Sequence, residues 1–132
     1  MLVGQKILIT GAQGRVAFPI ARALAENNDV YGLARFTNEL DQHRLRSVGI
    51  KCIKKDLRCE PVDDLANDFD YVLHAAVFHG APPLGVHAQD TWNHAFDVNV
   101  FATGRLMYHC HRTKGFFYFS SGWVYQYQSG HR

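Results

Sequence analysis

Three small residues, Gly11, Gly14 and Ala17, lie three positions apart within the stretch Lys6–Leu24, KILITGAQGRVAFPIARAL. An apolar run precedes them and apolar residues at helical spacing follow, so the cluster lies where a strand leads into a helix. In such a turn the first glycine permits the bend, the second lets a pyrophosphate approach the backbone, and the third small residue lets the helix pack closely. The N–H groups at the helix N-terminus would face the phosphates. The spacing predicts a dinucleotide-binding turn, and a tight turn without a ligand is the alternative.

The end of the next apolar run indicates which dinucleotide would bind. About 20 residues after the glycines, where an acidic residue would contact the ribose of NAD, the sequence has Ala34 and then Arg35. A carboxylate at this point would repel a 2′-phosphate, whereas an arginine can pair with it through two N–H donors. The sequence therefore favours NADP over NAD, with a solvated arginine at a strand end as the alternative.

Short β-rich runs alternate with helical patterns along the chain, which is typical of βαβ units. We expect strands at 6–10, 30–35, 50–56, 69–77 and 115–121, helices at about 15–27, 39–48 and 89–111, and a helical turn opened by Pro61. Right-handed crossovers make this order an α/β fold with a doubly wound parallel sheet of five strands. Residues expected on inward faces are Val16, Ile20, Ala23 and Leu24, then Leu40, Leu45 and Val48, and the aromatic run 116–119. Ile50, Cys52 and Lys54 are expected to share one face of their strand.

Five motifs then occur in order: TGAQGRVA (10–17), KDL (55–57), VLHAA (72–76), DVNVFAT (97–103) and FFYFSSGWVY (116–125). With these motifs the chain resembles the N-terminal part of the extended short-chain dehydrogenases/reductases, of the NAD(P)-dependent epimerase/dehydratase family. The resemblance covers essentially the whole chain and implies a Rossmann-like domain. It also implies an oxidoreductase-type enzyme acting on a sugar nucleotide or another carbonyl or alcohol substrate.

The resemblance implies a set of cofactor-binding residues. In the family, the acid matching Asp56 contacts adenine, the small residues matching Ala75 and Ala76 let the cofactor lie across the sheet edge, and the asparagine matching Asn99 supports the active site. Helix capping, simple packing and an exposed polar side chain are the respective alternatives. His74 is more readily a core histidine than a catalytic one. The implied set is Gly11, Gln13, Gly14, Arg15, Val16, Arg35, Asp56, Leu57, Ala75, Ala76, Val77 and Asn99.

Ser121 matches the catalytic serine of the family, which would hold the substrate oxygen while a tyrosine exchanges the proton. The family's Tyr-x-x-x-Lys pair, in which the lysine lowers the pKa of the tyrosine, has no match in the 132 residues. Family members also continue into a substrate lobe. We therefore expect a truncated or partial member that is catalytically incomplete, and keep a non-catalytic nucleotide-binding module as the alternative.

Composition adds few constraints. The 132 residues suit a single domain, and 14 basic and 12 acidic residues are mixed along the chain, so no basic arm predicts nucleic-acid binding. The N-terminal apolar run is too short for a signal peptide, and no run approaches the ~18 residues of a membrane span. Three cysteines and eight histidines show no metal-binding spacing. We expect a cytoplasmic protein with reduced cysteines and no metal, and keep a monomer and a homodimer as alternatives.

Overall fold

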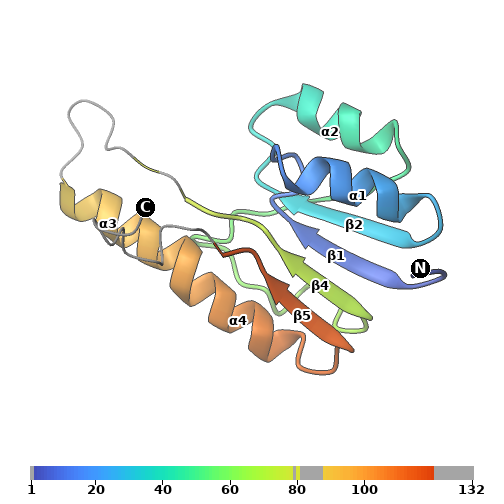
Figure 1. Ribbon diagram of the computed structural model, residues 1–132. Coiled ribbons are helices and arrows are strands. Elements are labelled where there is room, and N and C mark those ends of the chain that lie inside the picture. The colour runs from blue at the N-terminus through green and yellow to red at the C-terminus, as the bar shows by residue number, and fades with distance from the viewer. Residues whose placement is uncertain (1, 79, 81–87, 121–132) are drawn as a thin grey trace, which may run out of the picture.

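The computed structural model describes residues 2–78, 80 and 88–120, which form a single parallel sheet with helices on both faces (Figure 1). The strand order is β3-β2-β1-β4-β5, and every neighbouring pair is parallel. This confirms the doubly wound, Rossmann-like α/β fold with five strands. The elements are β1 Lys6–Thr10, α1 Ala17–Ala25, β2 Asp29–Ala34, α2 Glu39–Arg46, β3 Lys51–Lys54, β4 Tyr71–His74, α3 Ala88–Phe96, a π-helical turn η1 Asp97–Phe101, α4 Ala102–His109 and β5 Gly115–Tyr118.

Each face of the sheet has its own apolar core, because successive side chains of a strand point to opposite faces. Ile7 and Ile9 of β1 pack with residues of α1 and α2, whereas Leu8 packs with Leu106 of α4. Figure 1 shows α1 and α2 on one side of the sheet and the long α3–α4 segment on the other. The side chains of Ile7, Leu8 and Ile9 are fully buried, as expected for a central strand covered on both faces.

The connection from β3 to β4 reverses the direction in which strands are added. β2 and β3 lie on one side of β1, whereas β4 and β5 lie on the other. The carboxyl ends of β1 and β4 therefore flank the switch point of the sheet, which is where ligands bind in open α/β sheets. The glycine turn follows β1, and the segment 75–78 follows β4.

The inward faces of the first two helices differ from the sequence expectation. Val16 is 62% exposed and Ala23 is exposed, while Ala17 and Ala21 are the buried residues of α1. The reason is that α1 begins at Ala17 and presents the alanines to the sheet, where small side chains allow close packing. In α2, Leu45 is buried as expected, but Leu40, in the first turn of the helix, is 73% exposed.

The short turn expected after Pro61 is present, and in it the Leu65 N–H donates to the Val62 carbonyl oxygen. Lys54 is exposed because β3 is an edge strand. The expectation that the aromatic run is core was wrong in part. In the aromatic run, Phe117 and Tyr118 are 55% and 46% exposed, because β5 lies at the other edge with no strand beyond it in the described part of the chain.

The helix expected at 89–111 is divided into α3, η1 and α4. The Ala102 N–H donates to the carbonyl oxygen of Asp97, five residues earlier, which is the hydrogen-bond pattern of a π-helix. A π-turn inserts extra backbone into a helix and so rotates the side chains that precede it relative to those that follow. Hydrophobic spacing alone does not reveal this turn, because it changes the helix by about one residue.

Candidate functional site

The turn after β1 brings its small residues close together through local hydrogen bonds. Gly11 has a φ of +65°, which is the left-handed region that favours glycine. The Gly14 N–H donates to the Gly11 carbonyl oxygen at 2.9 Å, and the Phe18 N–H donates to the Gly14 carbonyl oxygen at 2.9 Å. Ala17, 2% exposed, packs against the sheet as its small size predicts. The chain therefore makes a tight bend and enters α1 immediately afterwards.

Several groups of this turn fit an anionic, hydrogen-bonding ligand. Among the described residues, the N–H groups of Arg15 and Val16 have no backbone acceptor. These groups precede the first turn of α1, where the helix dipole favours negative charge. The Gln13 side-chain oxygen Oε1 is buried and has no hydrogen-bond partner in the described structure. A buried acceptor without a donor is costly, so a ligand donor at Gln13 would satisfy it. The turn thus fits the phosphates and hydroxyl groups of a dinucleotide.

The segment after β4 lies directly against this turn. A Cβ atom at Gly11 would lie 2.9 Å from both the Cα and the N atom of Ala76. The Ala75 N–H donates to the Thr10 carbonyl oxygen at 3.2 Å. Ala75 and Ala76 are half-buried, and Val77 is 46% exposed. The structure therefore brings Gly11 and these three residues to one place, and the absence of a side chain at Gly11 serves this close approach.

Asn99 holds the same segment from the other side. Its Oδ1 accepts a hydrogen bond from the Phe78 N–H at 2.8 Å, and its Nδ2 donates to the Phe78 carbonyl oxygen at 3.2 Å. Asn99 is the central residue of η1, so the π-turn aims its amide at the segment after β4. The alternative of an exposed polar side chain at this position is therefore wrong, because both ends of the amide are bonded to the backbone of Phe78.

His74 ends β4 and is fully buried. Its Nδ1 lies 2.6 Å from the Thr10 hydroxyl oxygen, and its Nε2 lies 2.9 Å from the Thr103 hydroxyl oxygen. Burial lowers the pKa of His74 to about 4, so the imidazole is neutral near pH 7. The interpretation of His74 as a core histidine with satisfied ring nitrogens agrees with this geometry. The sequence did not single out its partners Thr10 and Thr103.

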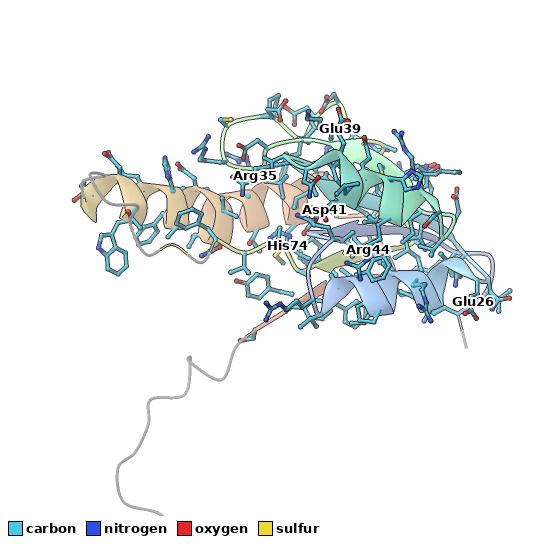
Figure 2. All side chains as sticks on the ribbon, turned by 90° about the horizontal axis from the view of Figure 1, so that it is seen from above. Glu26, Arg35, Glu39, Asp41, Arg44 and His74 are labelled. Carbon is cyan, nitrogen blue, oxygen red and sulfur yellow. The ribbon has the colours of Figure 1, made fainter. Side chains whose placement is uncertain are left out.

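Arg35 lies at the carboxyl end of β2, beside the switch point. It is exposed, directly after β2, and lines a hollow of about 520 Å³ at the carboxyl ends of β2 and β3. In Figure 2, Arg35 and His74 lie near the middle of the view, away from Glu26 at one end. The residues lining the hollow are Arg35, Thr37, Lys54, Asp56, Arg58 and Glu60. Of these, only Arg35 and Asp56 are among the site residues predicted from the sequence.

The carboxylates of Asp56 and Glu60, which line this hollow, already bond to groups within their own loop. Asp56 Oδ2 pairs with the Arg58 guanidinium at 3.4 Å, and Asp56 Oδ1 accepts from the Arg58 N–H at 2.9 Å. The Glu60 carboxylate accepts from the Asp56 N–H. In the part of the chain that is described, neither Arg35 nor Lys54 forms an ion pair. The hollow therefore has two cationic side chains available for an anionic ligand.

The loop containing Asp56 and Leu57 is tied to the helices on the α4 side of the sheet. Leu57 is 5% exposed and its carbonyl oxygen accepts from the Arg105 guanidinium of α4. The Arg58 guanidinium lies 3.3 Å from His94 Nε2 of α3. Asp56 acts as a turn cap through its bond to the Arg58 N–H, and no helix follows it. The alternative of a helix N-cap at Asp56 is therefore wrong for the described residues.

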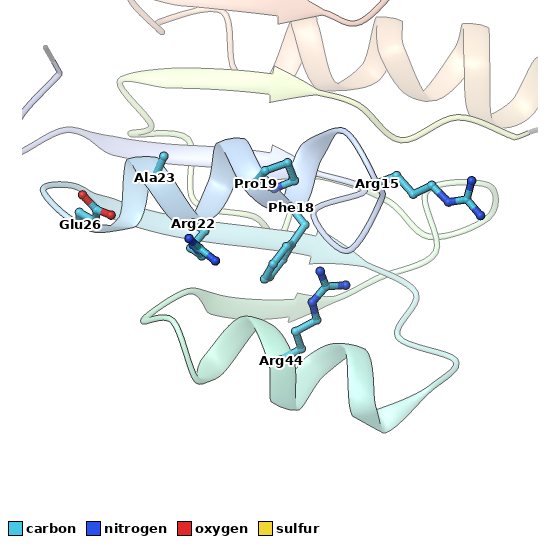
Figure 3. Close-up of a pocket in the computed structure, with 7 residues that line it drawn as sticks. All are labelled: Arg15, Phe18, Pro19, Arg22, Ala23, Glu26 and Arg44. Atoms are coloured by element: carbon cyan, nitrogen blue, oxygen red, sulfur yellow. The ribbon is translucent and has the colours of Figure 1, made fainter.

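A second hollow, of about 420 Å³, lies over α1 and α2, and its lining residues are drawn in Figure 3. The Arg44 guanidinium of α2 stacks on the Phe18 ring of α1, 3.6 Å from its centre. Figure 3 shows the Arg15 side chain extending from the start of α1 away from Arg22 and Glu26. Because this hollow lies on the outer helix surface, we place the candidate site at the strand ends.

Three further points concern the remaining expectations. Ser121 lies outside the described residues. Within residues 2–78, 80 and 88–120, no group of three or more histidine, cysteine or acidic side chains could hold a metal ion. None of the helices in these ranges is both long and apolar enough to cross a bilayer.

The sequence matches the model of the NAD dependent epimerase/dehydratase family over residues 7–131. The chain belongs to this family, which confirms the resemblance drawn from the five motifs. Comparison with curated protein sequences found no match.

Solved structures of the same fold come from epimerases and a dehydrogenase. UDP-glucuronic acid 4-epimerase from Bacillus cereus, in complex with NAD and UDP-4-deoxy-4-fluoro-glucuronic acid, is 25% identical with a TM-score of 0.74. UDP-N-acetylglucosamine 4-epimerase from Methanobrevibacter ruminantium is 22% identical with a TM-score of 0.76. A short chain dehydrogenase from Burkholderia cenocepacia in complex with NADP is 21% identical with a TM-score of 0.80.

These matches cover nearly all of this chain but only part of each structure. The shares of this chain are 96%, 99% and 96%, and the shares of the solved chains are 43%, 43% and 59%, respectively. The chain therefore spans about half the length of these proteins.

Proposed function

We propose that the chain binds a nicotinamide dinucleotide as part of an oxidoreductase-type epimerase, dehydratase or reductase. The observation that carries the proposal is the convergence of the glycine turn and the segment 75–78 at the switch point. There, among the described residues, the buried Oε1 of Gln13 lacks a donor and the N–H groups of Arg15 and Val16 lack backbone acceptors. Family membership supports the same conclusion. When bound, the nicotinamide would accept or donate a hydride.

We further propose that NADP binds more tightly than NAD. Arg35 and Lys54 line one hollow at the ends of β2 and β3, and no ion pair engages either one in the described residues. A guanidinium can bind a phosphate through two N–H donors, and the ammonium adds a second positive charge. The ribose-binding acid expected for NAD is absent after β2. The neighbouring Asp56 and Glu60 are engaged within their loop.

Calorimetric titration of the chain with NADP and NAD tests both proposals. We expect NADP to bind about tenfold more tightly, since a hydrogen-bonded charge pair in an exposed hollow is worth about 1.5 kcal/mol. Arg35→Ala and Lys54→Ala should each narrow the difference, while Arg112→Ala, an exposed arginine beyond α4, should leave it unchanged. No binding of either dinucleotide would overturn the proposed function. An unchanged preference in Arg35→Ala would contradict only the role of Arg35.

A non-catalytic nucleotide-binding module is the second candidate, favoured by the lack of a Tyr-x-x-x-Lys spacing in the 132 residues. Both candidates give the same expectation for this polypeptide, which is dinucleotide binding without dehydrogenase turnover. They differ in the gene: a reading frame that continues beyond Arg132 into Tyr-x-x-x-Lys supports the enzyme, and a stop codon supports the module. Turnover of an alcohol or carbonyl substrate by the 132-residue chain would contradict the expectation.

For the enzyme, we propose a sugar nucleotide or a similar carbonyl or alcohol as substrate. The solved epimerases of the same fold act on UDP-sugars, as their names state. Ser121 would orient the substrate oxygen, in keeping with its match to the family's catalytic serine. The proton would be moved by a tyrosine that a lysine activates.

We also propose that the chain pairs with a second copy through α3, η1 and α4. This segment exposes six large apolar side chains, and large exposed apolar patches commonly mark interaction sites. The residues are Trp92, Phe96, Val100, Phe101, Met107 and Tyr108. Light scattering coupled to gel filtration should show a dimer that Trp92→Glu shifts toward the monomer, with Gln89→Glu as the matched control.

The free state of Cys52, Cys59 and Cys110 supports a reducing compartment such as the cytoplasm.

A further inference from the structure

One chain of hydrogen bonds crosses the protein interior from the glycine turn to the π-turn, and its centre is His74. Thr10 at the end of β1 lies 2.6 Å from His74 Nδ1, and Thr103 of α4 lies 2.9 Å from His74 Nε2. All three residues come from different elements, more than twenty residues apart in sequence. None of the cofactor contacts proposed above uses the imidazole. A buried histidine with both nitrogens engaged therefore calls for its own explanation.

The direction of every bond in this chain follows from counting hydrogens. The Thr103 hydroxyl donates its single hydrogen to the Asn99 carbonyl oxygen at 3.1 Å, so its oxygen accepts from His74 Nε2–H. A neutral imidazole has one N–H, which leaves Nδ1 as the acceptor of the Thr10 hydroxyl. The Thr10 oxygen in turn accepts from the Ala76 N–H at 3.1 Å. Each donor meets one acceptor, without a surplus hydrogen.

The charged form of the imidazole does not fit this arrangement. With hydrogens on both nitrogens, His74 would face the Thr10 oxygen as a second donor, and the Thr10 hydroxyl hydrogen would lose its acceptor. The groups packed against the ring are the two threonine hydroxyls and the rings of Phe116 and Tyr118, at centroid distances of 6.1 and 5.6 Å. These contacts include no carboxylate that could balance a buried charge.

Both ends of the chain act on the backbone that follows β4. At one end Thr10 fixes the Ala76 N–H, and at the other Asn99 fixes the N–H and the carbonyl oxygen of Phe78. We propose that His74 is a positioning residue of the dinucleotide site, whose neutral, Nε2-protonated imidazole orients the Thr10 and Thr103 hydroxyls and thereby holds the backbone 75–78. This inference rests on the proposed function, because that backbone is where the dinucleotide would lie. His74 itself touches neither cofactor nor substrate, so it is not a catalytic residue.

Two variants of Thr103 distinguish the effect of its hydroxyl group from the effect of its side-chain shape. Thr103→Val keeps the branched side chain and removes both hydrogen bonds, whereas Thr103→Ser keeps the hydroxyl. We expect the NADPH dissociation constant to rise about tenfold in Thr103→Val, as two ordinary hydrogen bonds predict, and to stay within about twofold of the unaltered chain in Thr103→Ser. His74→Phe preserves the packing against Phe116 and should weaken binding at least as much. Circular dichroism and thermal unfolding show whether each variant is folded.

The tautomer of the His74 imidazole can be measured, and packing alone would not determine it. In a long-range ¹H–¹⁵N correlation spectrum of the ¹⁵N-labelled chain at pH 7, His74 should show a proton on Nε2 and none on Nδ1. In Thr103→Val this preference should weaken. A proton on Nδ1 in the unaltered chain would overturn the proposal, as would wild-type NADPH affinity in a folded Thr103→Val variant. If the unaltered chain binds no NADPH, the proposed function fails and the inference falls with it. If it binds and the variants bind equally, only the inference fails.

Discussion

Gly11 and Ala76 approach so closely that a Cβ atom at Gly11 would lie 2.9 Å from the backbone N of Ala76. The two residues follow β1 and β4, which are neighbours in the sheet. Their contact closes the switch point, because the turn after one strand rests on the segment after the other. Gly11 therefore meets two separate requirements, a positive φ and the absence of a side chain.

Gly11→Ala should destabilise the chain by about 3 kcal/mol, since a positive φ costs an alanine about 1 kcal/mol and overlap with rigid backbone costs about 2 kcal/mol more. Gly4→Ala is the matched control, because Gly4 has a φ of +67° with nothing within 4 Å of the added Cβ. It should lose only about 1 kcal/mol. Urea unfolding measures both free energies. Equal losses in the two variants would show that the Ala76 contact does not constrain Gly11.

Gly32→Ala should overpack the core between β2 and α2. The added Cβ would lie 2.7 Å from Leu45 Cδ2 and 3.0 Å from Ala12 Cβ. We expect a loss of about 2 kcal/mol in the free energy of unfolding. Leu45→Ala alone should cost about 3 kcal/mol, and the double variant should cost at least about 1 kcal/mol less than the sum. Additive losses would mean that Leu45 is not the side chain that limits the space at Gly32.

Asn99→Asp should loosen the backbone after β4. A carboxylate can still accept from the Phe78 N–H, but it cannot donate to the Phe78 carbonyl oxygen and would face that oxygen with a negative charge. We expect a loss of about 2 kcal/mol in stability and weaker NADPH binding. Asn93→Asp makes the same chemical change at an exposed position of α3, where the side chain only accepts from Gln89. Thermal unfolding and calorimetry compare the two, and similar behaviour would contradict the role assigned to the Asn99 amide.

Stability should fall with decreasing pH in a way that depends on His74. Burial lowers the folded-state pKa of His74 to about 4 from an ordinary value of 6.5. The unfolded chain therefore takes up a proton below pH 6.5 that the folded chain refuses until about pH 4, and stability is lost within this window. The loss attributable to His74 approaches about 3 kcal/mol at the acidic end.

Urea unfolding of the unaltered chain and of His74→Asn between pH 7 and 4 isolates this contribution. Lysine partners lower the pKa of several aspartates, such as Asp64, Asp68 and Asp70. Protonation of these aspartates in acid therefore destabilises both proteins. The difference between the two curves belongs to His74, and it should shrink as the pH falls. Parallel curves would indicate that the folded protein protonates His74 as easily as the unfolded chain does.

Local patterns predicted much of the fold. The first strand was predicted at its exact bounds, 6–10, because a continuous apolar run between a polar start and a glycine leaves little choice. The other strands were placed correctly, although the expected runs 50–56 and 69–77 were longer than β3 and β4. Strand ends depend on which neighbour continues to pair, and that is not visible in one run of sequence.

Helix faces were predicted less well. Val16 and Leu40 were expected to be inward on hydrophobicity and are exposed, because helix starts and sheet edges decide which turn of a helix faces the core. Composition predicts that the aromatic run of β5 is core, yet Phe117 and Tyr118 are exposed at the sheet edge. Arg35 and Asp56 are predicted from the sequence, whereas Lys54 joins their hollow only through the parallel alignment of β2 with β3.

The sequence by itself determined the fold class, the family and the glycine turn, because each depends on residue types at short, fixed spacings. Only the tertiary structure showed that Gly11 rests on Ala76, that a π-turn aims Asn99 at Phe78, and that His74 joins Thr10 to Thr103. These contacts link residues tens of positions apart, and their geometry depends on strand order and on a one-residue change in helix register. The physical reason is that a hydrogen-bond network is defined by distance and direction in space, whereas a motif records only the order of residues along the chain.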